Sequence, residues 1–259
     1  MVLPTYITRI HQHAFYDCIN LTSVVIGDNV TTIEEFAFND CLGIMNVIIG
    51  EGVTYIGEYA FSSCRGLTSI IIPKNVVAIG ENAFNGCARL VEIYNKSSLE
   101  IVAGGFSYEV GYYAKKVYTE PYISKLSTTD NGYVLYTDED EIGIIAYRGE
   151  EKFLMLPSNG TYINQSAFEG CDELTGIVIA DGVTVIGEDA FRGCSNLTNI
   201  TIPNSVLEME YGVFYGCEKL TSITFNGTMA QWGEMKKDGW WNEFVPAEKV
   251  VCSDGEVNL

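Results

Sequence analysis

The chain has 259 residues, 47% hydrophobic and 19% charged, so it is long and apolar enough to bury a sizeable core. Its 34 acidic and 15 basic side chains give a formal net charge of −19, which disfavours nucleic acid or an anionic membrane surface as a partner. No apolar run reaches about 18 residues, so the sequence predicts no transmembrane helix.

Residues 1–94 contain a 23-residue repeat, marked by an Ala-Phe pair and by a cysteine three residues after each phenylalanine. A fixed period of this length is typical of solenoids, because one coil cannot bury its apolar side alone and stacked coils share a continuous core. Since equivalent residues of stacked coils lie about 4.8 Å apart, we expect both residue types to form structural ladders. The members in this block are Phe15, Phe38, Phe61, Phe84, Cys18, Cys41, Cys64 and Cys87.

The clearest copy runs from Leu67 to Cys87 and predicts three parts of a coil. LTSIII alternates and is rich in β-branched residues, which predicts a strand with Ile70 and Ile72 pointing inward. Pro73 ends that strand, and VVAI predicts a second, shorter extended piece. ENAFNGC predicts a single helical or 3₁₀ turn. The expected fold class is therefore an α/β repeat solenoid of 23-residue coils, dominated by β structure.

Residues 95–152 interrupt the period and predict an irregular island. Strands are expected at 133–136 and 142–147, on either side of the acidic turn 138–141, and they predict a β-hairpin packed on the solenoid. The acidic turn lacks the ligand spacing of a calcium-binding loop, so a solvated hairpin tip is the favoured interpretation.

Regular coils resume over residues 153–225, and residues 226–259 form a polar and aromatic tail. The ladder members of the second block are Phe168, Phe191, Phe214, Cys171, Cys194 and Cys217. We expect the tail, with Trp232, Trp240 and Trp241, to be a C-terminal cap, because the last coil of a solenoid needs a cover. A tryptophan-lined ligand site is the alternative.

The copy L-x-x-I-x-I-P-x-x-V-x-x-I-G-x-x-A-F-x-x-C resembles the BspA-type leucine-rich repeat (LRR) of bacterial surface proteins, and copies cover residues 1–94 and 153–225. The resemblance implies a leucine-rich-repeat superhelix and a role in adhesion or host binding, and it supplies no catalytic residues. Residues 1–20 fit only the second half of a coil, so we expect a signal peptide upstream of Met1. A natural start with a frayed first coil is the alternative.

The cysteines and histidines predict neither a disulfide framework nor a metal site. A 23-residue spacing gives a ladder rather than clustered zinc ligands, and buried free cysteine behaves as a small hydrophobe. His11 and His13 are expected to be surface imidazoles, and no cofactor or catalytic motif is predicted. The least favoured alternative is a hydrolase in the island, where no nucleophile–base pair accompanies the tyrosines. These are Tyr108, Tyr112, Tyr113 and Tyr118.

One row of side chains is a candidate binding surface. The residue between the two inward positions of each long strand should face outward, and an apolar row across adjacent strands is typical of an interaction surface. In the first block the row is Val25, Ile48, Ile71 and Tyr94, and in the second it is Val178, Thr201 and Thr224. Two other interpretations stay open: strand propensity alone favours β-branched residues here, or the island covers the row.

We therefore expect a non-catalytic recognition or adhesion module, secreted or at the cell surface, that binds a host or matrix protein or a glycan. No nucleic-acid partner is expected, and the oligomeric state is left open. The alternative is a structural spacer within a larger surface protein. A spacer needs no exposed apolar row and shows no saturable binding.

Overall fold

The computed structural model describes residues 1–106, 109–121, 123–139 and 141–259. Its backbone contacts divide the chain into two compact units, Met1–Ser124 and Lys125–Leu259, and each unit has its own hydrophobic core. The boundary lies inside the segment 95–152, which was predicted to be one island.

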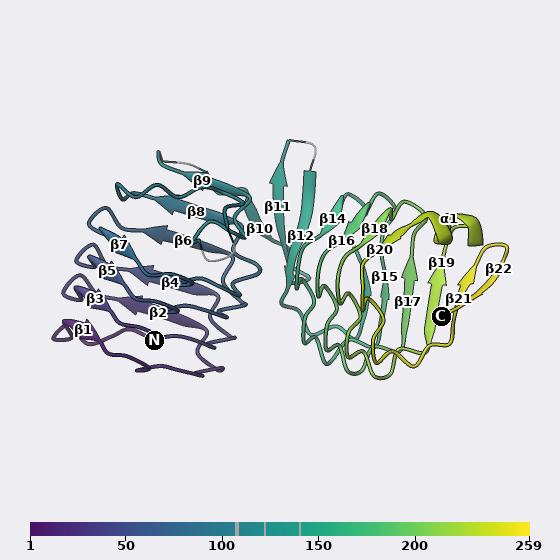
Figure 1. Ribbon diagram of the computed structural model, residues 1–259, viewed down its shortest axis with the longest axis horizontal. Helices are drawn as coiled ribbons and strands as arrows, with labels where there is room; N and C mark the ends of the chain where they lie inside the picture. Colours follow the sequence, from purple (N-terminus) through teal and green to yellow (C-terminus); the bar gives the residue numbers. More distant parts are fainter. Residues whose placement is uncertain (107–108, 122, 140) are drawn as a thin grey trace. The chain divides into compact units, whose positions relative to one another are not determined.

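In the first unit, each coil contributes one longer strand, and successive strands start 23 residues apart. They are β2 (Ser23–Ile26), β4 (Asn46–Ile49), β6 (Ser69–Ile72) and β8 (Glu92–Asn95). β2 pairs in parallel with β4, and β6 pairs in parallel with β8. β9 (Lys116–Tyr118), from the segment predicted as an island, adds a further parallel strand beside β8. Figure 1 shows these strands as successive rungs of the coil stack.

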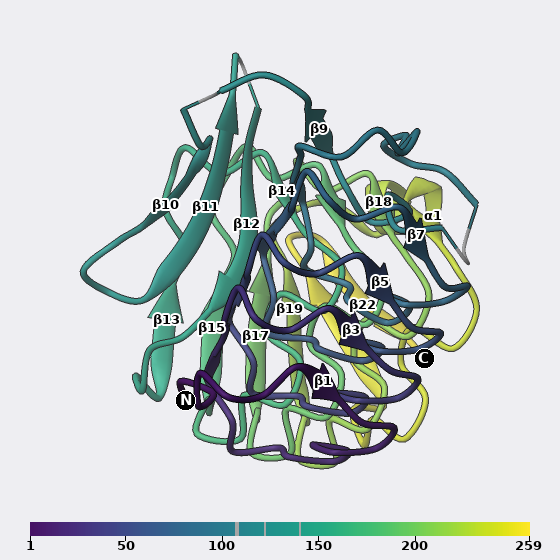
Figure 2. The same ribbon diagram turned by 90° about the vertical axis from the view of Figure 1, so that its left-hand side faces the viewer.

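A second, two-residue strand in each coil forms another parallel sheet of the first unit, which confirms the shorter extended piece predicted for the repeat. Its strands are β1 (Arg9–Ile10), β3 (Thr32–Ile33), β5 (Tyr55–Ile56) and β7 (Ala78–Ile79). Figure 2 shows them one above another. They pair in this order, so β7 is an edge strand of the sheet.

The second unit contains the same two kinds of sheet. One consists of β13 (Phe153–Met155), β15 (Gly176–Val178), β17 (Asn199–Ile202), β19 (Ser222–Phe225), β21 (Lys249–Cys252) and β22 (Gly255–Asn258). The other consists of β10 (Leu126–Thr128), β11 (Tyr133–Asp138), β12 (Glu141–Tyr147), β14 (Tyr162–Ile163), β16 (Val185–Ile186), β18 (Glu208–Met209) and β20 (Lys236–Lys237). The predicted hairpin is present as the antiparallel pair β11–β12, and β12 pairs in parallel with β14 at the start of the coil stack. Asp140, in its acidic turn, lies outside the described residues.

The segments around the Ala-Phe pairs are hydrogen-bonded turns, so the helical or 3₁₀ conformation predicted there is not found among the described residues. In most coils the residue before the alanine and the residue before the cysteine have positive φ, for example 52° at Tyr59 and 58° at Ser63. Left-handed residues at this spacing stop a right-handed helix from propagating. Alternate turn amides donate to the next coil, as the Phe38 N–H does to the Ala60 carbonyl at 2.8 Å. The fold is a β-solenoid with almost no helix.

The one α-helix among the described residues, α1 (Met229–Glu234), begins at a capping box in which Thr228 and Gln231 each accept the other's backbone N–H. Trp232 of this helix is buried and packs edge-on against Trp241 at 5.7 Å between ring centroids. Trp241 in turn lies 6.2 Å from Phe214, the last phenylalanine of the ladder, while Trp240 is exposed. Across the described part of the chain, no helix combines the length and apolar character needed to cross a bilayer.

Candidate binding surfaces

The predicted outward row of the first unit lies at the third residue of each longer strand. Val25 is the register partner of Ile48, and Ile71 is the register partner of Tyr94. Their strand neighbours on either side point into the core, because side chains alternate between the two faces of a strand. In β6, for example, Ile70 and Ile72 are almost fully buried.

The centre of this row is open to solvent. Ile48 is 52% exposed and Ile71 is 46% exposed, whereas Val25 and Tyr94 are half-buried. Tyr94 is flanked by Tyr118 of β9 and by Lys96, whose ammonium lies 5.5 Å from the tyrosine ring. The segment after β8 therefore lies along the Tyr94 end of the row and leaves the two isoleucines exposed.

The structure adds Val2 to the row, a residue that the sequence analysis did not name. Val2 forms an isolated parallel bridge with Val25 and is 74% exposed. Val2 stands one 23-residue step before Val25, so the repeat period alone was enough to place it in the row.

In the second unit the corresponding row is half-buried and more polar. Val178, Thr201 and Thr224 are register partners along β15, β17 and β19. Met155, 71% exposed, continues the row at one end, and Val251, 41% exposed, continues it at the other. Met155 stands one 23-residue step before Val178, so the period was enough to place it, whereas Val251 follows Thr224 by 27 residues and departs from the period.

The predicted phenylalanine positions form two stacks inside the cores. Phe38 and Phe61 have centroids 5.1 Å apart with an interplanar angle of 2°, and Phe168 and Phe191 are 5.0 Å apart. Most members are fully buried, while Phe15 at the open end of its stack is half-buried. These residues stabilise the coil stack and are closed to a partner.

The cysteines form no disulfide within the part of the chain that the structure describes, and those buried in the coils donate to the previous coil. The Cys64 thiol donates to the Phe38 carbonyl at 3.3 Å, and the Cys194 thiol donates to the Phe168 carbonyl at 3.1 Å. Burial raises the pKa of Cys41 to about 11, so its thiol is protonated at neutral pH and is a poor nucleophile or metal ligand.

The histidines and the tyrosines of the island are spread over the surface. His11 lies 3.5 Å from the Glu34 carboxylate, and His13 stacks on Phe36 with centroids 5.1 Å apart. Tyr112 and Tyr113 contact each other edge-on at 4.6 Å, and the Tyr118 hydroxyl donates to Glu92 at 3.5 Å. Tyr108 lies outside the described residues. Within the described ranges, no three histidine, cysteine or acidic residues are grouped to hold a metal ion.

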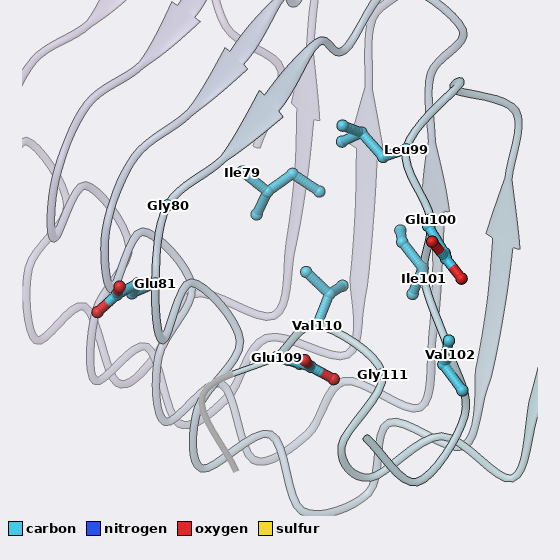
Figure 3. Close-up of a pocket in the computed structure, with 10 residues that line it drawn as sticks. All are labelled: Ile79, Gly80, Glu81, Leu99, Glu100, Ile101, Val102, Glu109, Val110 and Gly111. Atoms are coloured by element: carbon cyan, nitrogen blue, oxygen red, sulfur yellow. The ribbon is translucent and has the colours of Figure 1, made fainter. Parts of the chain in front are cut away.

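A pocket of about 460 Å³ lies beside β7 and is a concave feature that was not predicted from the sequence. Its lining is mainly apolar, from Ile79, Leu99, Ile101, Val102 and Val110, with Gly80 and Gly111. Figure 3 shows the Ile79, Leu99 and Val110 side chains directed toward a common space, with the carboxylates of Glu81 and Glu100 turned outward at its margins. A third glutamate, Glu109, also lines it and accepts the Phe106 N–H at 3.0 Å.

Residues 1–109 and 145–235 match the family described as a BspA type leucine rich repeat region, in six copies. No curated protein sequence matches the chain. Similar solved structures include a leucine rich cell surface protein from Faecalibacterium prausnitzii, 22% identical over 90% of this chain and 73% of that one, with a TM-score of 0.33. The pneumococcal vaccine antigen PcpA is 17% identical over 98% of this chain and 77% of its own, with a TM-score of 0.47. A leucine-rich repeat protein from Eubacterium ventriosum is 18% identical over 96% and 71%, with a TM-score of 0.45.

Proposed function

The chain belongs to the BspA-type leucine-rich repeat family, and from that premise we propose that it is a non-catalytic recognition module. It binds a host or matrix protein or a glycan through the outward strand row of its first unit. Repeats of this family are typically non-enzymatic and occur in bacterial surface proteins, so we place the module at the cell surface or outside the cell.

The observation that carries the proposal is the exposed pair of aliphatic side chains, Ile48 and Ile71, on adjacent coils. Strand propensity accounts for a β-branched residue at each position but not for the absence of polar ones, since threonine occupies the same position in the second unit. Apolar side chains grouped on a rigid surface are typical of interaction sites. Rigidity favours affinity, because little conformational entropy is lost on binding.

The charge of the chain narrows the class of partner. With a formal net charge of −19, the protein attracts basic surfaces and repels acidic ones over about one Debye length, and it does not repel neutral ones. A neutral or basic matrix protein fits this better than a highly sulfated glycan.

The test is a pull-down and titration with host extracellular-matrix and mucus glycoproteins, comparing the wild type with an Ile48→Thr/Ile71→Thr variant. Threonine keeps the branched β-carbon and removes apolar surface, so strand stability changes little while the recognised surface is lost. An Ile48→Asp/Ile71→Asp variant, shown by circular dichroism to be folded, gives the stronger perturbation. The matched control is Ile19→Thr/Leu42→Thr, at residues 49% and 43% exposed in the turns that follow the ladder cysteines.

Loss of saturable binding in both strand-row variants, with binding retained in the control, supports the proposal. Equal binding by all variants places recognition elsewhere on the chain. If no protein binds, including the wild type, the structural-spacer hypothesis is favoured.

A further inference from the structure

The coil that follows β7 lacks the ladder residues, and its strand β9 pairs with β8 at a step of 24 residues instead of 23. One 23-residue step from Ile79, Phe84 and Cys87 leads to Val102, Ser107 and Val110, so neither a phenylalanine nor a cysteine stands at the ladder positions. Val102 is 55% exposed, whereas Ile56 at the same position of an earlier coil is fully buried.

This segment bonds to its own continuation instead of to β7. The Gly104 N–H donates to the Gly111 carbonyl at 2.9 Å. The backbones approach so closely that a Cβ on Gly111 would lie 1.9 Å from the Val102 carbonyl oxygen. Within the described residues, no strand pairs with the outer edge of β7.

The outer edge of β7 therefore presents backbone carbonyl groups whose equivalents in earlier coils accept hydrogen bonds from the next coil. The Val77 N–H donates to the Thr54 carbonyl at 2.9 Å, and the Gly80 N–H donates to the Ile56 carbonyl at 2.8 Å. The equivalent acceptors one coil later are the carbonyl oxygens of Val77 and Ile79. No hydrogen bond to either is found in the part of the chain that the structure describes.

The apolar pocket lies beside this edge. Ile79 is only half-buried and forms one side of the pocket. The volume of the pocket, about 460 Å³, exceeds the space that one leucine or isoleucine side chain needs. Glu81, Glu100 and Glu109 are exposed at the pocket, and among the described residues that line it there is no basic side chain. The site thus combines strand acceptors, an apolar hollow and negative charge.

We propose that the outer edge of β7 accepts an extended, basic peptide segment of a partner protein. The segment adds as a parallel strand, donates two backbone N–H groups to Val77 and Ile79, and inserts one branched apolar side chain into the pocket. Lysine or arginine side chains beside that anchor meet Glu81 and Glu100. This site is separate from Ile48 and Ile71, so it is a second binding site beyond the proposed function.

The test uses the full chain and a seven-residue peptide of alternating lysine and isoleucine, acetylated and amidated at its ends. Titration is followed by amide chemical shifts in a nitrogen-15 labelled sample, with the expected shifts at Val77–Gly80 and Val110. A peptide N-methylated at the central residues cannot donate the two hydrogen bonds and should bind about tenfold more weakly or worse. A peptide of alternating glutamate and isoleucine should not bind.

Two protein variants, each with a control, test the contribution of the carboxylates and the access of the peptide to the pocket. Glu81→Gln/Glu100→Gln should weaken binding about threefold to tenfold at low salt. Its matched control is Glu58→Gln/Glu120→Gln, which makes the same charge change at two exposed residues of the same unit that do not line the pocket. Val102→Lys, at an exposed lining residue, should exclude the peptide, while Ile19→Lys should not.

The proposal is overturned if the lysine–isoleucine peptide does not saturate, or if N-methylation and Val102→Lys leave its affinity unchanged. It is also overturned if the shifted amides lie away from β7. The Ile48→Thr/Ile71→Thr variant should bind this peptide with the affinity of the wild type. A result against the strand row can therefore be distinguished from a result against the β7 site.

Discussion

Replacing Phe61 by alanine should strongly destabilise the first unit, because Phe61 occupies the interior of the phenylalanine stack. The ring is fully buried and lies between Phe38 at 5.1 Å and Phe84 at 5.4 Å, so the substitution leaves a cavity and removes two ring–ring contacts. Burial loss and the cavity together cost about 3–5 kcal/mol. We expect a value near the upper end of that range, since each ring pair contributes about 0.5–1.5 kcal/mol beyond its buried area.

The matched control is Phe15→Ala at the open end of the same stack. Phe15 is half-buried and, of the rings in the described ranges, stacks on that of Phe38 alone, at 4.9 Å, so its removal should cost about half as much. Phe61→Leu should fall between the two, because it keeps apolar volume and loses the ring contacts.

The assay is urea unfolding followed by far-UV circular dichroism and by tryptophan fluorescence. All three tryptophans lie between residues 232 and 241, so their fluorescence reports the second unit, whereas circular dichroism reports both. For a urea dependence of about 2 kcal/mol per molar, a loss of about 4 kcal/mol lowers the midpoint of the first unit by about 2 M. Equal losses for Phe61→Ala and Phe15→Ala would refute the view that stacking in the interior of the ladder holds the coils together.

Three further predictions concern thiols, carboxyls and turns. Since burial raises the pKa of Cys41 to about 11, only about a thousandth of this thiol is ionised at pH 8. Iodoacetamide should therefore modify Cys41 far more slowly in the native protein than in urea, as measured by mass spectrometry. Similar rates in the two conditions would contradict its burial. Burial, and then neighbouring carboxylates, raises the pKa of Glu188, so its contribution to stability is present in acid and lost as pH rises through the folded value. Glu188→Gln should therefore raise the thermal midpoint at neutral pH and not in acid below the ordinary glutamate range, and an equal rise at both would argue against desolvation as the cause. Ser63 has a φ of 58°, and the equivalent residue of the next coil is Gly86. Ser63→Gly should therefore stabilise the protein by about 1 kcal/mol in urea unfolding. A loss of stability would indicate that a contact of the serine side chain contributes more than the backbone strain costs.

Much of the coil could be predicted from the sequence because its period is also the period of the core. The 23-residue step places one strand start after another at Ser23, Asn46 and Ser69, and the alternation within each copy predicts which side chains are buried. The exposed positions of Ile48 and Ile71 follow from the same alternation. Whether they bind a partner is a property of that surface and of another molecule, which no periodicity predicts.

The turn conformation could not be predicted in this way. ENAFNGC has the composition of a helical turn, but Asn82 has φ of 57° and Gly86 has φ of 72°, because the turn backbone is set by hydrogen bonds between coils. In the turns of the first unit those bonds join residues 22 positions apart, and local propensity is weak against them.

The pocket beside β7 depends on contacts that the sequence pattern does not predict. The sequence by itself determines the repeat, the coil, the buried ladders and the loss of the phenylalanine and cysteine at Ser107 and Val110. Only the tertiary structure decided that the chain after Leu99 would bond to Gly111 rather than to β7, leaving strand acceptors and an apolar hollow open. The physical reason is that a coil without its core anchors has several backbone partners of similar energy, and packing against the rest of the unit selects one of them.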